Sequence, residues 1–221
     1  MGRWLIAILL GIALSGGAAG ADAPQGPLVG GDWYDTSCAP GNNLLRSSVD
    51  ATVEREELSA MHASGLRSLR LTINYTSDSS LLNGGHGGAI LIGSDGSMIE
   101  PYRSRFIHYL SDAKDAGFTD VTIAFYPYGP NSPQPWTTGE NINDWDPSLY
   151  GADWGFVQSV HDLTKQYGPS QTHFDLMAEG PPSGYDRNNV GGDQIDSFIM
   201  RLYSDYVSKY GNSDVFFTAI G

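Results

Sequence analysis

The sequence predicts an α/β fold built around a parallel sheet. Two observations indicate this fold class: short segments with alternating apolar residues recur along the chain, and segments with helical apolar spacing separate them. Strands that alternate with helices pair in parallel, because each intervening helix returns the chain to the same end of the sheet. Such strands are covered on both faces, which fits their largely apolar composition.

Five segments are predicted to be strands. Residues 68–75 alternate apolar and polar side chains, and residues 121–125 do the same before Pro127 ends the strand. The other predicted strands are residues 28–34, 173–179 and 215–220.

Four helices are predicted between these strands. Acidic residues in the first turns of the first segment suit the positive end of a helix, and Pro101 suits the first turn of the second. Gly65, Gly117 and Gly211 follow three of the segments, where helices commonly end. The predicted helices are residues 53–63, 101–113, 156–167 and 195–206.

Two long segments interrupt this alternation, residues 76–100 after the second strand and residues 128–151 after the third. Both leave the carboxyl ends of strands, where (β/α) barrels and open α/β sheets carry their active sites. Residues 94–97 in the first segment are predicted to form a turn. Because a TIM-type (β/α) barrel has eight strands, we expect residues 24–221 to form a partial barrel truncated after the fifth strand. An open five-stranded sheet is the alternative.

Residues 1–23 have the pattern of a secretory signal peptide. Arg3 precedes an apolar stretch, residues 4–14, that is too short for a stable membrane anchor. A cleavage site is offered by Ala19-Gly20-Ala21, with Ala21-Asp22-Ala23 as the neighbouring alternative. No cysteine directly follows the apolar stretch to carry a lipid. We expect an exported protein, secreted or periplasmic, without a stable membrane anchor.

Composition narrows the possible functions. Twelve basic and 25 acidic residues give a formal charge of −13, which would repel nucleic-acid phosphates. The single cysteine, Cys38, rules out an internal disulfide framework and a cysteine-rich zinc site. We therefore expect no nucleic-acid partner, no metal and no cofactor, and the sequence carries no signal for an oligomeric state.

Glu179 is the strongest candidate for a catalytic residue. It ends the apolar segment 173–179, and Gly180 and the two prolines after it stop the strand. A carboxylate at the carboxyl end of a strand is held by rigid backbone and faces the functional end of the sheet. The alternative is a solvated glutamate at the edge of a loop.

Two segments carry a resemblance to a known family. Residues 174–180, Phe-Asp-Leu-Met-Ala-Glu-Gly, resemble the fourth-strand signature of clan A glycoside hydrolases, especially the cellulase-like family 5, in which an aromatic-acidic-aliphatic run ends in Asn-Glu-Pro. Residues 65–71 resemble the helix end and the arginine-bearing second strand of that family. The order of elements matches the family up to the fifth strand.

This resemblance implies that Glu179 is the general acid/base and that Arg70 orders the catalytic carboxylates. A retaining glycosidase uses two carboxyl groups roughly 5–5.5 Å apart, one as nucleophile and one as proton shuttle. Burial and the neighbouring charge keep the shuttle protonated, while an arginine keeps the nucleophile ionised. A purely structural pairing of Arg70 with Asp175 or Glu179 is the alternative, and Asp175 is expected to be a polar group at the barrel floor.

The sequence departs from the family pattern at three places. Ala178 stands where the family has the asparagine that hydrogen-bonds the sugar 2-hydroxyl, so turnover should be slower or the subfamily different. Tyr126 and Tyr128 lie where a histidine is often found after the third strand. The nucleophile of the family comes from a seventh strand, and no residue of this chain can be assigned that role.

Aromatic residues gather at the predicted strand ends, which independently indicates a sugar partner. Flat aromatic rings pack against the apolar face of pyranose rings, and neighbouring polar groups hydrogen-bond the hydroxyls. Core packing is the alternative for each of them. The predicted substrate-binding residues are Trp33, Tyr34, Asn74, Tyr75, Tyr126, Tyr128 and Trp136.

The sequence thus predicts a secreted retaining glycoside hydrolase that acts on a β-linked polysaccharide or oligosaccharide, with its nucleophile expected beyond the end of this chain. The 221-residue chain alone is expected to be inactive. A non-catalytic carbohydrate-binding barrel is the main alternative. A barrel enzyme that uses Glu179 to abstract a proton ranks third, because no metal site or lysine at a strand end accompanies it.

Overall fold

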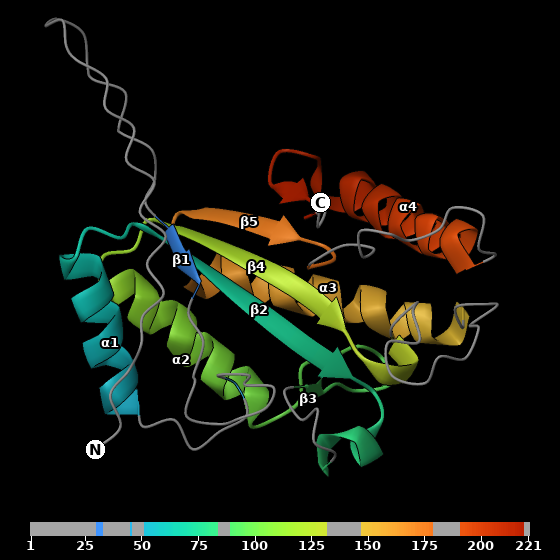
Figure 1. Ribbon diagram of the computed structural model, residues 1–221, viewed down its shortest axis with the longest axis horizontal. Helices are drawn as coiled ribbons and strands as arrows, with labels where there is room; N and C mark the ends of the chain where they lie inside the picture. Colours follow the sequence, from blue (N-terminus) through green and yellow to red (C-terminus); the bar gives the residue numbers. More distant parts are fainter. Residues whose placement is uncertain are drawn as a thin grey trace, which may run out of the picture.

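A computed structural model of the chain describes residues 30–32, 45, 51–83, 89–131, 147–178 and 191–218. The strands are β1 (Gly30–Asp32), β2 (Ser68–Thr76), β3 (Ile90–Leu91), β4 (Asp120–Pro127), β5 (Gln171–Asp175) and β6 (Val215–Phe216). They form one sheet in the order β1-β2-β4-β5-β6, and every neighbouring pair in this order is parallel (Figure 1). The short strand β3 also pairs with β2 in parallel.

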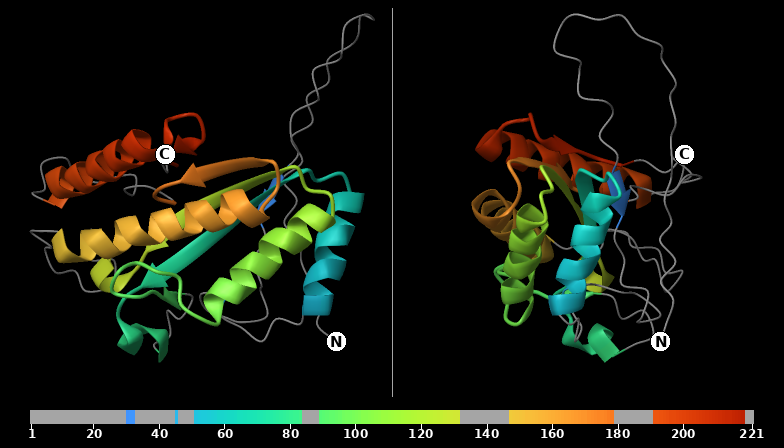
Figure 2. Two further views of the ribbon diagram at one scale, coloured as in Figure 1. Left: turned by 180° about the vertical axis from the view of Figure 1, so that it is seen from behind. Right: turned by 90° about the vertical axis from the view of Figure 1, so that its left-hand side faces the viewer.

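The described α-helices are α1 (Ala51–Ala63), α2 (Tyr102–Asp115), α3 (Pro147–Tyr167) and α4 (Gly191–Tyr210). Helices α1, α2 and α3 cover one face of the sheet, the face turned to the viewer on the left of Figure 2. Short 3₁₀ helices follow two strands: η1 (Ser79–Asn83) comes after β2, and η2 (Gly129–Asn131) comes after β4. None of the described helices is both long and apolar enough to cross a membrane.

The predicted alternation of strands and helices is confirmed, with some boundaries shifted. The strand predicted for residues 173–179 is β5, which ends at Asp175, and residue 179 lies outside the described residues. The helix predicted for residues 156–167 begins earlier, at Pro147, inside the segment predicted as a loop up to residue 151. Proline suits this first turn because the first N–H groups of a helix have no intrahelical partner. The predicted signal peptide and Cys38 also lie outside the described residues.

The two faces of the sheet differ in polarity, because successive side chains of a strand point to opposite sides. In β2 the buried Leu69, Leu71 and Ile73 alternate with the partly exposed Arg70 and Asn74. The apolar side packs against the helices, and burying it supplies the main stabilising contribution to the fold. The largest fully buried side chains of this core are Tyr75, Phe106, Tyr109, Phe125, Phe156, Phe174, Phe198 and Tyr206.

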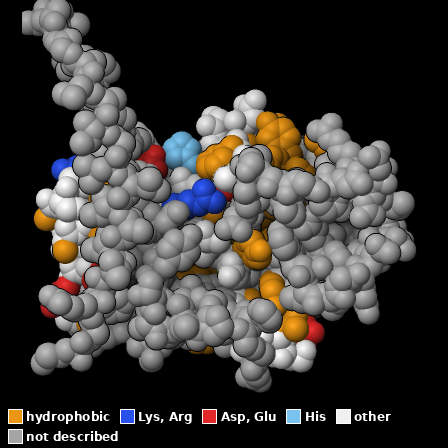
Figure 3. Space-filling view, viewed as in Figure 1, with side chains coloured by type: hydrophobic (Ala, Val, Ile, Leu, Met, Phe, Trp, Pro, Cys, Tyr) orange, Lys and Arg blue, Asp and Glu red, His pale blue; other side chains and the backbone are white. Residues whose placement is uncertain are grey.

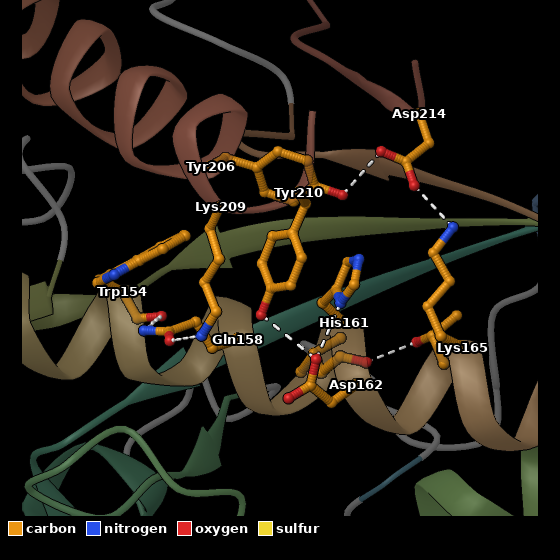
Figure 4. Close-up of polar contacts among 11 residues, drawn as sticks. Trp154, Gln158, His161, Asp162, Lys165, Tyr206, Lys209, Tyr210 and Asp214 are labelled. Atoms are coloured by element: carbon orange, nitrogen blue, oxygen red, sulfur yellow. Dashed lines mark hydrogen bonds and ion pairs between the residues drawn. The ribbon is translucent and has the colours of Figure 1, made fainter. Parts of the chain in front are cut away.

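Polar and aromatic contacts hold α4 against α3 (Figure 4). The ring of His161 in α3 stacks on that of Tyr210 in α4, with ring centroids 3.6 Å apart. Lys165 of α3 pairs with Asp214 at 2.6 Å, and the same carboxylate accepts the Tyr206 hydroxyl at 3.0 Å. Asp214 directly precedes the edge strand β6, and its carbonyl oxygen accepts the N–H of Phe174 in β5. These contacts therefore also hold the start of β6 against β5.

Glu54 is a carboxyl group buried between helices. It lies in α1, it is only 9% exposed, and its Oε1 atom has no hydrogen-bond partner. Burial raises its pKa to about 7, and Asp112 in α2 adds to the rise, while Arg105 and Arg55 oppose it. The folded state therefore binds more protons than the unfolded state between pH 4.5 and pH 7, so the contribution of Glu54 to stability falls as the pH rises through this window.

We expect Glu54→Gln to stabilise the protein at pH 8 by on the order of 2 kcal/mol, because the amide carries no charge to bury. The gain should shrink as the pH falls towards 4.5. Urea unfolding at both pH values measures it, with the exposed Glu56→Gln of the same helix as control. A gain of equal size at both pH values would contradict the assignment to ionisation.

Candidate active site

The polar face of the sheet carries an ion pair between Arg70 in β2 and Asp175 at the end of β5. Arg70 Nη2 donates to Asp175 Oδ2 at 2.8 Å, and Asp175 is 0% exposed. Thr218, beyond β6, donates its N–H to Asp175 Oδ1 at 3.0 Å and its hydroxyl to Asp175 Oδ2. With three donors fixed around it, this carboxylate is suited to hold Arg70 in place rather than to move a proton.

Arg70 reaches over β4 to make this pair, because β4 lies between β2 and β5 in the sheet. Ala124 of β4 is the register partner of both Thr72 and Asp175. The residues on either side of Ala124 point into the core, so the side chain of Ala124 points to the polar face. Because this side chain is small, it leaves room for Arg70 to cross β4. Figure 3 shows basic, acidic and imidazole side chains close together on this face.

The carboxyl ends of β2 and β4 bring two predicted substrate-binding residues together. Asn74 and Tyr126 are register partners in the parallel pair, and both are partly exposed. Asn74 lies four residues beyond Arg70 along β2, so the alternation places both on the same face. An amide and a phenol at adjacent strand ends are groups that recognise sugar hydroxyls and sugar ring faces.

Backbone hydrogen bonds direct the chain beyond β5 towards these strand ends. The N–H of Leu176 donates to the Phe216 carbonyl at 3.1 Å, and the N–H of Ala178 donates to the Phe125 carbonyl at 2.7 Å. After β5 the chain therefore bonds first to β6, through Leu176, and then to β4, through Ala178. The bond to β4 is made at Phe125, the residue before Tyr126. Glu179 is the next residue in the sequence after Ala178, and it lies outside the described residues, so its catalytic role stays a prediction.

Tyr75 does not line this face, contrary to its predicted role in binding substrate. It shares the alternation of the core residues of β2, is 1% exposed, and lies with its ring centroid 4.4 Å from that of Phe156 in α3. Its side chain also hydrogen-bonds Asp153, and burial raises its pKa well above the ordinary value. Tyr75 is therefore a residue of the core between the sheet and α3.

The predicted roles of Tyr128, Trp33, Tyr34 and Trp136 in binding substrate stay predictions. Tyr128 follows β4, is partly exposed, and donates its N–H to the Tyr75 carbonyl at 2.8 Å. Trp33, Tyr34 and Trp136 lie outside the described residues.

Three polar residues that sequence reasoning did not connect lie near one another in the sheet: Ser68 begins β2, Asp120 begins β4, and His173 is the third residue of β5. Asp120 of β4 accepts the Ser68 hydroxyl at 2.9 Å, and its other oxygen is 3.1 Å from Nε2 of His173. Strand alternation places Asp120 and His173 on the polar face and is the signal that could have found them. In the part of the chain that the structure describes, no group of three or more His, Cys, Asp or Glu residues could hold a metal ion.

The parallel order of the strands, the helices between them and the polar residues facing away from those helices define the class of fold, an α/β fold of the TIM-barrel type. A solved structure bears out this fold class. A crystal structure of a GH5_18 variant from Streptomyces cattleya in complex with Manb1-4GlcNAc has a TM-score of 0.51 and 13% sequence identity over 81% of this chain. At this identity the likeness confirms the predicted resemblance to family 5-type glycoside hydrolases at the level of the fold.

This chain spans 43% of the Streptomyces cattleya chain. A GH5_18 structure from Bifidobacterium longum subsp. infantis has a TM-score of 0.47 and 14% identity, covering 74% of this chain and 40% of its own. No protein-family model and no curated protein matches the sequence.

Proposed function

We propose that the protein is an exported glycoside hydrolase that cleaves a β-linked polysaccharide or oligosaccharide by a retaining mechanism, with Glu179 as the general acid/base. One observation carries the proposal: the N–H of Ala178 donates to the carbonyl of Phe125, beside the strand ends that carry Asn74 and Tyr126. Ala178 is the residue before Glu179 in the sequence. A carboxyl group following that bond would stand above the polar face on which Arg70 is fixed. The fold is that of a protein whose crystal structure contains a disaccharide.

In the proposed reaction, Glu179 first donates its proton to the glycosidic oxygen and then takes a proton from the water that releases the sugar. Asn74 and Tyr126 would bind the sugar at the strand ends. Arg70 would supply a fixed positive charge next to the second carboxylate, the nucleophile, which we expect on a later strand. Residues 1–23 would direct export and be removed.

The Glu179→Gln variant of the full-length protein tests this proposal. We expect kcat on aryl β-glycosides or β-linked glucans and mannans to fall by a factor on the order of 10² to 10⁴, because the amide cannot donate the proton. The fold should be unchanged, and the exposed Glu56→Gln should keep the parent activity. Product released with retained anomeric configuration would support the two-carboxylate mechanism.

A carbohydrate-binding protein without activity is the second candidate, and Ala178 favours it. The side chain at this position is buried and has no group to hydrogen-bond a sugar hydroxyl. A parent protein that binds β-linked glycans but hydrolyses none would establish this candidate. Equal hydrolysis by the parent and Glu179→Gln would exclude the assignment of Glu179.

A further inference from the structure

A buried hydrogen-bond chain joins the segments that leave the carboxyl ends of β2 and β4. Asn131, at the end of η2, accepts the N–H of Ser77 at 2.7 Å and the Ser77 hydroxyl at 2.8 Å through its Oδ1 atom. Its Nδ2 group donates to Asp153 Oδ1 of α3 at 2.8 Å. Asp153 also hydrogen-bonds the side chain of Tyr75. Asn131 and Asp153 are both almost completely buried.

These contacts are made where the two long segments of the sequence begin. Ser77 directly follows β2, and Asn131 lies four residues after β4 ends. Asn74 and Tyr126, the proposed sugar-binding pair, lie within five residues of these points along their own strands. The Tyr128 N–H bond to the Tyr75 carbonyl adds a second link between the two strand ends.

We propose that Asp153 and Asn131 are positioning residues that fix the carboxyl ends of β2 and β4 relative to each other, and with them the sugar-binding pair of the proposed site. Neither residue touches substrate. Asp153 holds the Asn131 amide in one orientation, and Asn131 in turn holds the turn at Ser77. The functional part of this inference rests on the proposed function, whereas the coupling between Asp153 and Ser77 does not.

The buried carboxyl group makes this coupling dependent on pH. Burial raises the pKa of Asp153 to about 8, while hydrogen bonds from Asn131 and Tyr75 oppose the rise. Tyr75 is the titratable group that acts on it from β2, and η2 contributes the neutral Asn131. When the strand ends open and the carboxyl group meets water, its pKa returns to its ordinary value near 3.8. The closed form therefore binds the additional proton between these values and weakens as the pH rises through them.

Hydrogen exchange of the Ser77 amide tests the proposal on the full chain, without any activity assay. We measure by NMR how strongly this amide is protected, relative to a free peptide, at pH 5, 6 and 7. The protection should fall by up to about tenfold per pH unit in the parent. It should stay level in Asp153→Asn, whose amide has no proton to lose. The matched control Asp162→Asn changes a 68%-exposed carboxylate of the same helix and should keep the parent slope.

The backbone amide of Phe174 in β5 donates to the carbonyl of Asp214, and it reports on the sheet away from these strand ends. A Ser77 slope steeper than that of Phe174 in the parent, lost in Asp153→Asn, supports the proposal. It is overturned if Ser77 and Phe174 share one slope in the parent, or if the Ser77 slope survives in Asp153→Asn. If Asp153→Asn does not fold, the comparison of the Ser77 and Phe174 slopes in the parent protein alone decides whether the proposal holds. If the hydrogen-exchange result supports the proposal and Glu179→Gln hydrolyses substrate as the parent does, the coupling between Asp153 and Ser77 stands. Only the proposed catalytic role of Glu179 is then discarded.

Discussion

Replacing Gly155 with alanine is expected to lower the free energy of unfolding by about 3 kcal/mol, because the site has no space for a methyl group. Gly155 lies in α3 directly under the turn that follows β3. A Cβ atom there would stand 2.0 Å from the carbonyl oxygen of Asp95. The contact is between two backbones, so no side-chain rotation can relieve it.

The turn above Gly155 has little freedom to move away. Gly93 donates its N–H to the Ser97 carbonyl at 2.9 Å, and Ile92 pairs with Met98 in an antiparallel bridge. Gly96 adopts φ +81°, which favours glycine, and a Cβ atom there would be 2.1 Å from the Ala152 carbonyl oxygen. The helix and the turn therefore approach each other through glycine on both sides.

Gly151→Ala provides a matched control in the same helix. A Cβ atom at Gly151 would meet nothing within 4 Å, so alanine should stabilise the helix by roughly 0.5–1 kcal/mol. Urea unfolding followed by circular dichroism should move the two variants in opposite directions from the parent. If Gly155→Ala were as stable as Gly151→Ala, the backbone contact at Asp95 would not exist in solution.

The order of strands and helices was predictable because burial imposes the two periodicities that the sequence shows. The alternation of Leu69, Leu71 and Ile73 gave both the strand β2 and the opposite orientation of Arg70. The same alternation assigns Tyr75 to the core, because it lies two residues after Ile73 on the same face of β2. The prediction for Tyr75 was wrong because it rested on the position of this residue near the strand end and not on the face to which its side chain points. The predicted turn at residues 94–97 is confirmed.

The contacts of the polar groups were harder to predict, because they join residues far apart in the sequence. The Arg70–Asp175 pair was foreseen as an alternative, but Thr218 completes it from beyond β6 and has no pattern of its own. Asp153 carried a signal that was missed. It is an acidic residue on the buried side of α3, three residues after Tyr150 and four before Val157, and a buried polar group of this kind needs a hydrogen-bond partner.

Removal of the Arg70 side chain is the other change with a large expected effect. Arg70→Ala should lower the free energy of unfolding by about 3 kcal/mol or more, because it leaves the carboxylate of Asp175 buried without a cation. Arg103→Ala is the matched control, since Arg103 and Glu100 are about half exposed and 4.0 Å apart. An exposed pair of this kind contributes roughly 0–1 kcal/mol.

A second substitution separates the charge of Arg70 from its packing. Asp175→Asn should destabilise the parent, because the amide replaces an acceptor of the Arg70 and Thr218 hydrogen bonds with a donor. In the Arg70→Ala background the same change should instead recover part of the lost stability, because it removes the unpaired buried charge. The reversal of sign is specific to an ion pair. If Asp175→Asn destabilised both backgrounds equally, the contribution of Arg70 would come from the apolar part of its side chain where it crosses β4 at Ala124.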